Sequence, residues 1–222
     1  MQETSLHADL KNWYAQPGDQ IEAFVDGFII DIVRQDLLIE IQTRNFSNLK
    51  SKLTYLLKQH PVRLVHSIPQ EKWIVRMDPA GQVVLSRRKS PKRGRPEHIF
   101  KELIRITNLI KHPNLSIEIL MTREEEIWHD DGRGSWRRKG WSIANRRLLE
   151  VLSSLVLTSV MDYHCFLPSR LPGLFTVREM ATALGQYHSL AGKMVYTLNG
   201  IGVIERVGKK GQAWVYQESV SK

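Results

Sequence analysis

The sequence contains a single cysteine, Cys165, and no apolar stretch long enough to cross a membrane. One thiol forms no internal disulfide and has no cysteine neighbours with which to build a zinc site. A bilayer-spanning helix needs about 20 consecutive apolar residues, and the first residues of the chain lack the basic and apolar regions of a secretory signal. We therefore expect a protein of the reducing cytoplasm that is not embedded in a membrane.

Acidic residues are fewer than basic ones. The chain has 32 lysines and arginines against 23 aspartates and glutamates, which gives a formal net charge of +9. Such an excess of positive charge raises the local concentration of polyanions, so DNA is the expected partner. With 222 residues, of which 42% are hydrophobic, the chain is long enough for one core and a small second domain.

The first third of the chain alternates between helical and strand-like patterns. Residues 3–15 and 45–60 carry apolar side chains at helical spacing. Residues 21–33 and 37–43 contain three short strands separated by two polar turns, and residues 62–68 form a further strand. A strand, a helix and a strand in this order allow a parallel pair with a helical crossover. The sequence therefore predicts an α/β fold with a mixed sheet.

The middle of the chain continues this pattern with more charge. We expect strands at 73–77, 82–86 and 115–121, a basic loop at 86–96, a helix at 97–112 and an exposed hairpin at 123–141. In that hairpin Trp128, Trp136 and Trp141 lie among arginines, a mixture suited either to stacking on unpaired bases or to packing the hairpin on the domain.

A second domain is expected from residue 148, so that the chain divides into 1–147 and 148–222. Residues 146–159 are predicted to form an apolar helix, followed by a proline-containing linker, two helices and a two-stranded hairpin. Thr176 and Glu179 have the spacing of a capping box, which marks a helix start.

Three polar residues interrupt the apolar strands near the N-terminus. Side chains alternate along a strand, so Glu40 and Gln42 point to one face, and a hairpin closing before residue 37 brings Asp31 towards Glu40. Converging carboxylates are tolerated when a divalent cation lies between them, and oxygen ligands suit Mg²⁺. Alternatively, Asp31 and Glu40 are solvated residues at a strand edge.

The order helix, strand, strand with Asp31, strand with Glu40-Ile41-Gln42, helix, strand resembles the core of the PD-(D/E)XK nuclease superfamily, which has the restriction-endonuclease-like fold. The resemblance implies that Asp31 and Glu40 bind Mg²⁺ or Mn²⁺ with the backbone carbonyl of Ile41. It also implies that Glu3 is an accessory acid, with His7 one turn further along the first helix. Gln42 stands where the family usually has a lysine that positions the attacking water.

Two further features bear on this site. Glu22, on the first strand, is either a second accessory acid or an exposed strand carboxylate. Many nucleases that share this fold act as dimers, so the resemblance also implies a homodimer.

The basic loop contains Arg93-Gly94-Arg95-Pro96, which resembles the core of AT-hook peptides that enter the minor groove. The alternatives are a loop that contacts phosphates without reading sequence and a merely solvated loop. Either DNA-binding version makes a DNA-facing patch of Arg87, Arg88, Lys89, Lys92, Arg93 and Arg95.

The C-terminal helix, helix and hairpin resemble a winged helix-turn-helix domain over residues 175–217. The resemblance implies that the helix carrying Lys193 enters a DNA groove and that Lys209 and Lys210 form the tip of the wing. Winged helices also bind proteins, and that alternative stays open.

The sequence thus predicts a metal-dependent endonuclease that hydrolyses phosphodiester bonds in DNA, with a C-terminal domain that aids binding. The alternative is a non-catalytic DNA-binding regulator or repair accessory with an inactive nuclease-like core. A scaffold that binds proteins is a third, weaker hypothesis.

Overall fold

The computed structural model describes residues 5–136 and 140–219. Its first third follows the predicted order of elements. They are α1 (Ser5–Tyr14), β1 (Gln20–Val25), β2 (Phe28–Arg34), β3 (Leu37–Ile41), the 3-10 turn η1 (Phe46–Leu49), α2 (Lys50–Leu56) and β4 (Val62–Met77). Val25 pairs with Phe28 across the turn between β1 and β2. The Asp26-Gly27 turn has positive φ at both positions, which suits the tight turns that join twisted antiparallel strands.

The remaining elements complete a large sheet and form a C-terminal unit. They are β5 (Val84–Lys89), η2 (Pro96–Ile99), α3 (Phe100–Leu103), β6 (Leu115–His129), β7 (Ser142–Leu157), η4 (Val160–Phe166), α4 (Val177–Leu184), α5 (His188–Ile201), β8 (Ile204–Lys210) and β9 (Ala213–Glu218). None of the helices in the described ranges is long and apolar enough to span a bilayer.

The large sheet has the order β1-β2-β3-β4-β6-β7, and β5 pairs with β4. β3 and β6 both run parallel to β4, and the other pairings are antiparallel. The prediction of an α/β class with a mixed sheet is confirmed, as is the parallel pair whose crossover contains α2.

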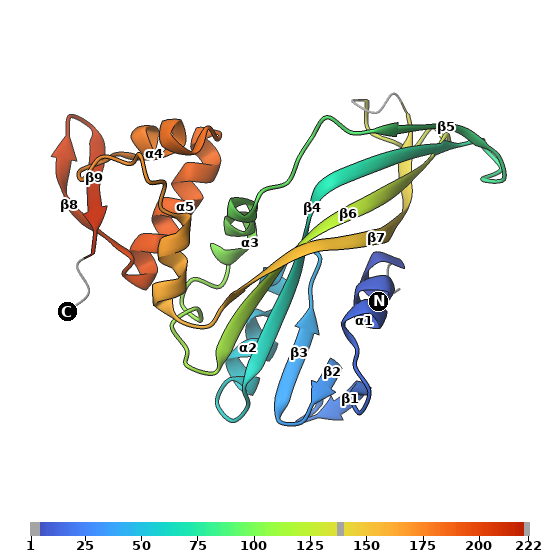
Figure 1. Ribbon diagram of the computed structural model, residues 1–222, viewed down its shortest axis with the longest axis horizontal. Helices are drawn as coiled ribbons and strands as arrows, with labels where there is room; N and C mark the ends of the chain where they lie inside the picture. The colour runs from blue at the N-terminus through green and yellow to red at the C-terminus, as the bar shows by residue number, and fades with distance from the viewer. Residues whose placement is uncertain (1–4, 137–139, 220–222) are drawn as a thin grey trace.

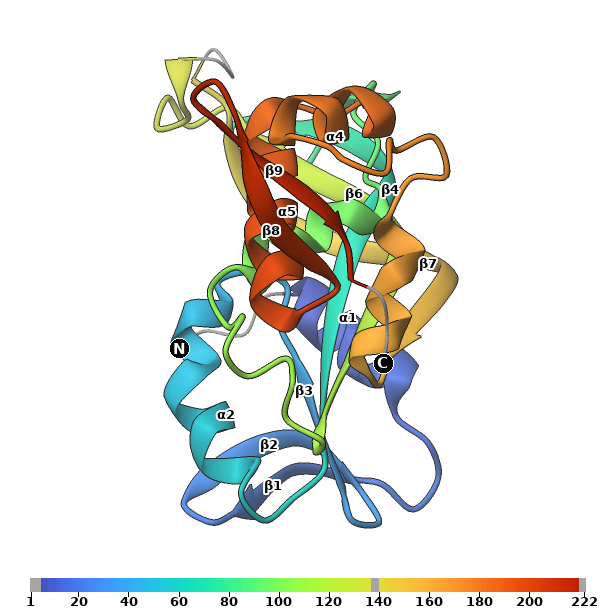
Figure 2. The same cartoon turned by 90° about the vertical axis from the view of Figure 1, so that its left-hand side faces the viewer.

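Helices cover both faces of the sheet (Figures 1 and 2). Leu64 on β4 packs in a cluster with Leu53 of α2 and Phe100 of α3. Val65, the next residue, packs in a second cluster with Leu10 of α1. Because successive side chains on a strand point to opposite faces, α1 lies on one face and α2 and α3 on the other.

The strands β4 and β6 are longer than predicted. The expected strands at 62–68 and 73–77 are parts of one strand, β4, which pairs with β6 along its length. β3 pairs with β4 at Val62 to Val65, and β5 pairs with it at Trp73 to Met77. Since β6 occupies one edge of β4, β3 and β5 share the other edge and leave a gap between them.

The linker that follows β5 closes this gap. The N–H of Ser90 donates to the carbonyl of Lys72, and the N–H of Gly94 donates to that of Pro69 at 2.8 Å. A Cβ atom on Gly94 would lie 2.5 Å from the carbonyl oxygen of Pro69. The linker therefore lies against β4 as closely as glycine allows, and the predicted loop at 86–96 begins as strand β5.

The prediction of a helix at 146–159 is wrong, because residues 142–157 form strand β7. This strand pairs antiparallel with β6 from His129↔Ser142 to Ile117↔Leu157. Leucines and valines suit either element, and pairing with a long neighbouring strand outweighs their local preference. The expected domain boundary at 147/148 falls inside β7, so the sheet extends to Leu157. The helix predicted at 97–112 is also shorter, consisting of η2 and α3.

The C-terminal unit has the predicted helix, helix and hairpin, α4, α5 and β8-β9 (Figure 1). Thr176 caps α4, and its backbone N–H donates to the Glu179 carboxylate, which confirms the capping box. The unit is not detached from the sheet. Leu198 of α5 belongs to the same buried cluster as Leu103 of α3 and Leu64 of β4.

Candidate functional site

Register brings three carboxylates side by side on β1, β2 and β3. β2 and β3 pair at Ile32↔Ile39, so the next position along each strand puts Asp31 opposite Glu40. β1 and β2 pair at Ile21↔Ile32 and Ala23↔Ile30, which puts Glu22 opposite Asp31. We call Glu22, Asp31 and Glu40 the carboxylate row. The predicted approach of Asp31 to Glu40 is therefore present.

Asp31, in the middle of the carboxylate row, is held by donors on both sides. The backbone N–H of Ile41 donates to its Oδ2 atom at 2.8 Å, and Nε2 of His7 on α1 lies 3.2 Å from the same oxygen. Burial would raise the pKa of Asp31, but the His7 and Ile41 hydrogen bonds oppose it and hold the pKa below its usual value. Asp31 therefore stays ionised at neutral pH.

Glu40 is buried and paired with a lysine that the sequence analysis did not identify. Its side chain is 6% exposed, and Nζ of Lys52 on α2 lies 2.5 Å from its Oε1 atom. Burial, and then the negative charge of Asp31, raise the pKa of Glu40 to about 7 although Lys52 opposes the shift. Lys52 Nζ also donates to the carbonyl of Ile29 on β2. The sequence puts Lys50, Lys52 and Lys58 mostly off the apolar face of this segment and does not distinguish among them.

Glu22 forms the outer end of the carboxylate row. Nζ of Lys11 on α1 lies 2.5 Å from Glu22 Oε1, and the Glu22 side chain is 57% exposed. Glu22 has a φ of 52° in the middle of a strand, a region that non-glycine residues seldom adopt. Among the described pairings, β1 and β2 skip the position of Glu22 and Asp31. The backbone is distorted at the row itself.

Gln42 forms hydrogen bonds with Asn45 and His66. Its side-chain amide donates to the carbonyl of Asn45 at 3.3 Å, and its own carbonyl accepts from Nδ1 of His66 at 2.6 Å. Burial lowers the pKa of His66, so the ring is neutral. His66 therefore fixes the end of β3, whereas the nitrogen nearest Glu40 comes from Lys52 and not from residue 42.

The carboxylate row suits a hard divalent cation in its donor chemistry. Asp31 and Glu40 are both carboxylates, and their mutual repulsion contributes to the raised pKa of Glu40. A cation between them would remove that repulsion. In the described ranges no three His, Cys, Asp or Glu side chains form a ready metal cage. Mg²⁺ commonly uses one or two carboxylates with water and phosphate oxygens. Glu3, the predicted accessory acid, lies outside the described residues.

The first group of predicted DNA contacts is on β5 and is partly engaged within the protein. Arg87 stacks over the ring of Trp73 at 4.2 Å and pairs with Glu125 at 2.9 Å. Lys89 pairs with Glu71 at 2.7 Å. Arg88, between them, is exposed.

The residues of the predicted AT-hook core separate in the structure. Arg95 donates to the carbonyl of Leu184 at the end of α4 and pairs with Glu97. It therefore fastens the linker to the C-terminal unit. Arg93 turns to a cavity that Lys92 and Lys193 also line, so three predicted DNA contacts from two distant segments come together there.

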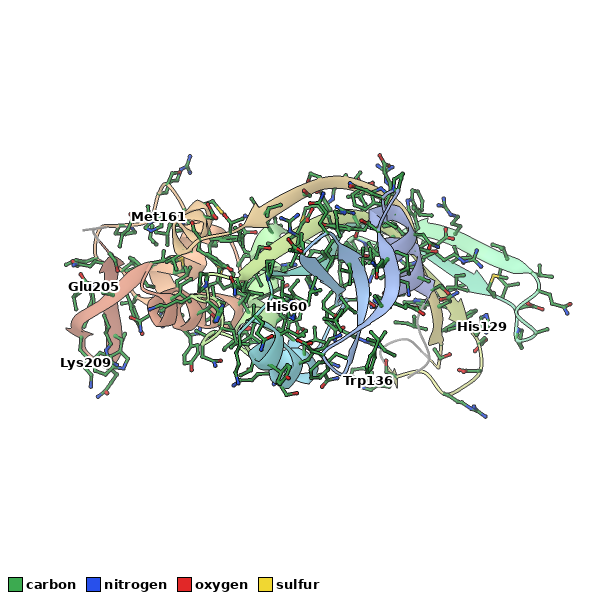
Figure 3. All side chains as sticks on the ribbon, turned by 90° about the horizontal axis from the view of Figure 1, so that it is seen from below. His60, His129, Trp136, Met161, Glu205 and Lys209 are labelled. Carbon is green, nitrogen blue, oxygen red and sulfur yellow. The ribbon has the colours of Figure 1, made fainter. Side chains whose placement is uncertain are left out.

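The predicted wing tip lies at the opposite end of the molecule from the β6-β7 hairpin. Figure 3 shows Lys209 at one end and His129 towards the other. Nζ of Lys209 lies 4.3 Å from the centre of the Trp214 ring, and Lys210 is 3.7 Å from Glu179. The predicted DNA contacts do not form one continuous patch.

The three tryptophans of the β6-β7 hairpin have different environments. Trp128 is 9% exposed and donates to Glu126, and Arg76 stacks over Trp141 at 4.9 Å. Trp136 is 83% exposed. Trp128 and Trp141 therefore pack as the structural alternative predicts, while Trp136 is accessible to a partner.

The sheet order and its two helical layers define a mixed α/β protein. The chain belongs to the family described as "Domain of unknown function (DUF8091)", which matches residues 4–158 and so ends just after β7. It is also 31% identical over 217 residues to an uncharacterized protein of Treponema pallidum (strain Nichols). That similarity covers 97% of this chain and 85% of the relative, so the C-terminal unit is shared as well. No solved structure matches the chain significantly.

Proposed function

We propose that the protein is a metal-dependent nuclease that hydrolyses phosphodiester bonds in DNA. The observation that carries this proposal is the placement of Asp31 and Glu40 on paired strands, with Lys52 of α2 beside Glu40. Two carboxylates on one hairpin, with an amine from α2 beside them, suit the metal-assisted hydrolysis of a phosphodiester. The restriction-endonuclease-like fold is part of the same proposal and is supported by the order from α1 to β4.

The metal would be held by Asp31 and Glu40, with the Ile41 carbonyl as a third donor. When bound, Mg²⁺ or Mn²⁺ supplies Lewis acidity towards water and the phosphoryl oxygens. Asp31 suits this role because its pKa is held low, which keeps it charged without a metal.

Lys52 would supply the positive charge that Gln42 lacks. An ammonium group 2.5 Å from Glu40 can stabilise negative charge on a phosphoryl oxygen as the phosphorus is attacked. His7 would act as a positioning residue, because it contacts Asp31 and fixes the orientation of that carboxylate.

One observation favours the non-catalytic alternative, a DNA-binding regulator or repair accessory. The ammonium of Lys52 already neutralises Glu40 within the protein, so the site is charge-compensated without a metal ion. In that case the carboxylate row would hold β1, β2 and α1 together and DNA binding would persist without cleavage. The α4, α5 and β8-β9 unit would serve as a winged helix in either version.

The test is cleavage of plasmid, single-stranded and branched DNA with Mg²⁺ or Mn²⁺ by the full chain. Asp31→Asn and Glu40→Gln should each lower the cleavage rate at least about a hundredfold, as expected for lost transition-state electrostatics. Lys52→Gln should do the same, with partial recovery in Lys52→Arg. Asp36→Asn is the matched control, since Asp36 is exposed in the turn of the same hairpin.

If no DNA is cut while all variants still bind it, the non-catalytic function is correct. Cleavage that persists in Asp31→Asn would show that the nuclease activity belongs to another site or to a contaminant. Sedimentation of the wild-type chain with and without duplex DNA tests the expected homodimer, which would bring two sites to the two strands.

A further inference from the structure

A cavity of about 800 Å³ lies between the linker after β5, α3 and the N-terminal end of α5. Five basic side chains line it, and we call them the cation pocket: Lys92, Arg93, His98, Lys101 and Lys193. They come from two segments that are far apart in the sequence, residues 92–101 and helix α5. The hydrogen bond from Arg95 to the Leu184 carbonyl, at 3.0 Å, fastens the first segment to the end of α4.

Among the described residues, the lysines and the arginine of the cation pocket pair with no carboxylate; Glu102, which lines an adjoining smaller cavity, accepts from the N–H of Phe46. No carboxylate is among the described residues that line the cavity. Lys92, Arg93, Lys101 and Lys193 form no ion pairs with any residue that the structure describes. Partial burial, followed by the charges of Lys193 and Lys92, lowers the pKa of Lys101. Gathering like charges costs free energy, which a bound anion would recover.

The cavity also offers a flat ring and a helix N-terminus. Tyr187 is 82% exposed and lines the cavity together with Ser189. It is the N-cap residue of α5 and makes no side-chain cap hydrogen bond. The N-terminal end of a helix attracts anions, and an exposed aromatic ring beside cations is suited to stacking on an unpaired base.

A smaller cavity adjoins the cation pocket and extends to the residues that follow β3. Its volume is about 290 Å³, and it shares Lys92, Arg93, His98 and Lys101 with the larger cavity. It lies along the gap in the edge of β4, where Gly94 contacts Pro69, and reaches Thr43. Thr43 follows the end of β3, the strand that carries Glu40.

We propose that the cation pocket binds an unpaired DNA strand, with a phosphate among Lys92, Lys101 and Lys193 and the neighbouring base stacked on Tyr187. The strand would then run through the smaller cavity along β4 towards Asp31 and Glu40. A duplex does not fit this arrangement, because its bases are already stacked on each other. The inference rests on the nucleic-acid part of the proposed function and names an unpaired strand as the substrate class.

The test is binding of fluorescent dT20 to the full chain in EDTA, so that no cleavage occurs, measured by anisotropy at several salt concentrations. Lys101→Gln/Lys193→Gln should lower the affinity at least about tenfold and reduce the salt slope by about 1.4, the value for two single-strand phosphate contacts. Lys58→Gln/Lys111→Gln is the charge-matched control outside both cavities and should leave both values unchanged.

Substitutions of Tyr187 distinguish the contribution of base stacking to binding from that of charge. Tyr187→Ala should lower the affinity for dT20 at least about fivefold, whereas Tyr187→Phe should keep it, since stacking needs only the ring. Inorganic pyrophosphate should compete weakly with dT20, and Tyr187→Ala should leave its inhibition constant unchanged, since pyrophosphate has no base to stack. Because Tyr187 is exposed, neither substitution disturbs the core.

Unchanged dT20 binding in both the lysine pair and Tyr187→Ala would overturn the inference, and so would an equal loss of affinity for dT20 and for a duplex of the same length in these variants. So would thymidine monophosphate binding as tightly as dT20, since the pocket would then hold a free nucleotide. The outcome is independent of catalysis. If dT20 binds as described but no DNA is cut with Mg²⁺, the nuclease proposal fails and the strand site remains.

Discussion

The carboxylate row and the cation pocket handle charge in opposite ways. In the row, each carboxylate has a basic partner from a helix: Lys11 and His7 from α1 and Lys52 from α2. In the cation pocket, the described residues provide no acidic partner. A balanced cluster contributes to the stability of the fold, whereas an unbalanced one costs free energy that a ligand of opposite charge would offset. The difference favours different ligands. The carboxylate row suits a cation that competes with Lys52 for Glu40, and the cation pocket suits an anion.

Removing Lys52 should break the balance of the carboxylate row and give the largest effect on stability. Lys52→Met leaves Glu40 buried beside Asp31 without a cation, and we expect the free energy of unfolding to fall by about 3 kcal/mol. Urea unfolding at about pH 9 measures it, because the wild-type Glu40, whose pKa is about 7, is ionised there. In Glu40→Gln/Lys52→Met the unpaired charge is gone, so most of the loss should be recovered. An equal loss in the single and double variants would mean that Lys52 contributes packing and not charge.

Mg²⁺ should stabilise the protein through the carboxylate row. A ligand at about 100 times its dissociation constant stabilises the folded state by about 2.7 kcal/mol, so thermal unfolding should shift upwards as Mg²⁺ is titrated. The shift should be lost in Asp31→Asn and kept in Asp36→Asn. An equal shift in Asp31→Asn would mean that Mg²⁺ acts elsewhere on the protein surface and not at the carboxylate row.

The β8-β9 hairpin, which is the proposed wing, provides a third arrangement of charge, because Lys209 and Lys210 already have partners in Trp214 and Glu179. Lys209→Gln/Lys210→Gln should reduce the salt slope of duplex binding by about 2, or about 1 for each phosphate contact, and leave dT20 binding unchanged. Filter binding at a series of salt concentrations measures both. A loss of dT20 binding in this variant would contradict the separation of the two surfaces.

Removing one charge from the cation pocket should have the smallest effect on the free energy of unfolding. The sign of this effect should be opposite to that of Lys52→Met. Lys101→Gln relieves like-charge repulsion, so the free energy of unfolding should stay the same or rise within about 0.5 kcal/mol. Urea unfolding at low salt measures this, with Lys58→Gln as the control. A decrease above about 1 kcal/mol would show that Lys101 has a structural role.

The sequence predicted the α1 to β4 region well because its signals are local. The turn at Asp26-Gly27 and the alternation around Glu40 depend on neighbouring residues, so the approach of Asp31 to Glu40 could be predicted. Lys52 could not be assigned, because several lysines share the polar side of α2. The choice among them depends on how the helix crosses the sheet.

The errors concern elements whose partners are far away in the sequence. β7 was predicted to be a helix because its leucines and valines also fit a helical face. It is a strand because β6 offers a partner along its whole length. The cation pocket escaped prediction for the same reason, since Lys101 and Lys193 meet only when α3 and α5 pack together.

The contact between Gly94 and Pro69 has a consequence for solubility. An uncovered strand edge can pair with a strand of another molecule and begin aggregation. The linker shields the middle of β4, because the N–H groups of Ser90 and Gly94 donate hydrogen bonds to β4 carbonyls. Any side chain at position 94 would collide with the Pro69 carbonyl. A substitution there would lift the linker and leave a length of β4 open. Gly94 therefore helps to prevent β4 from pairing with a strand of another copy of the protein.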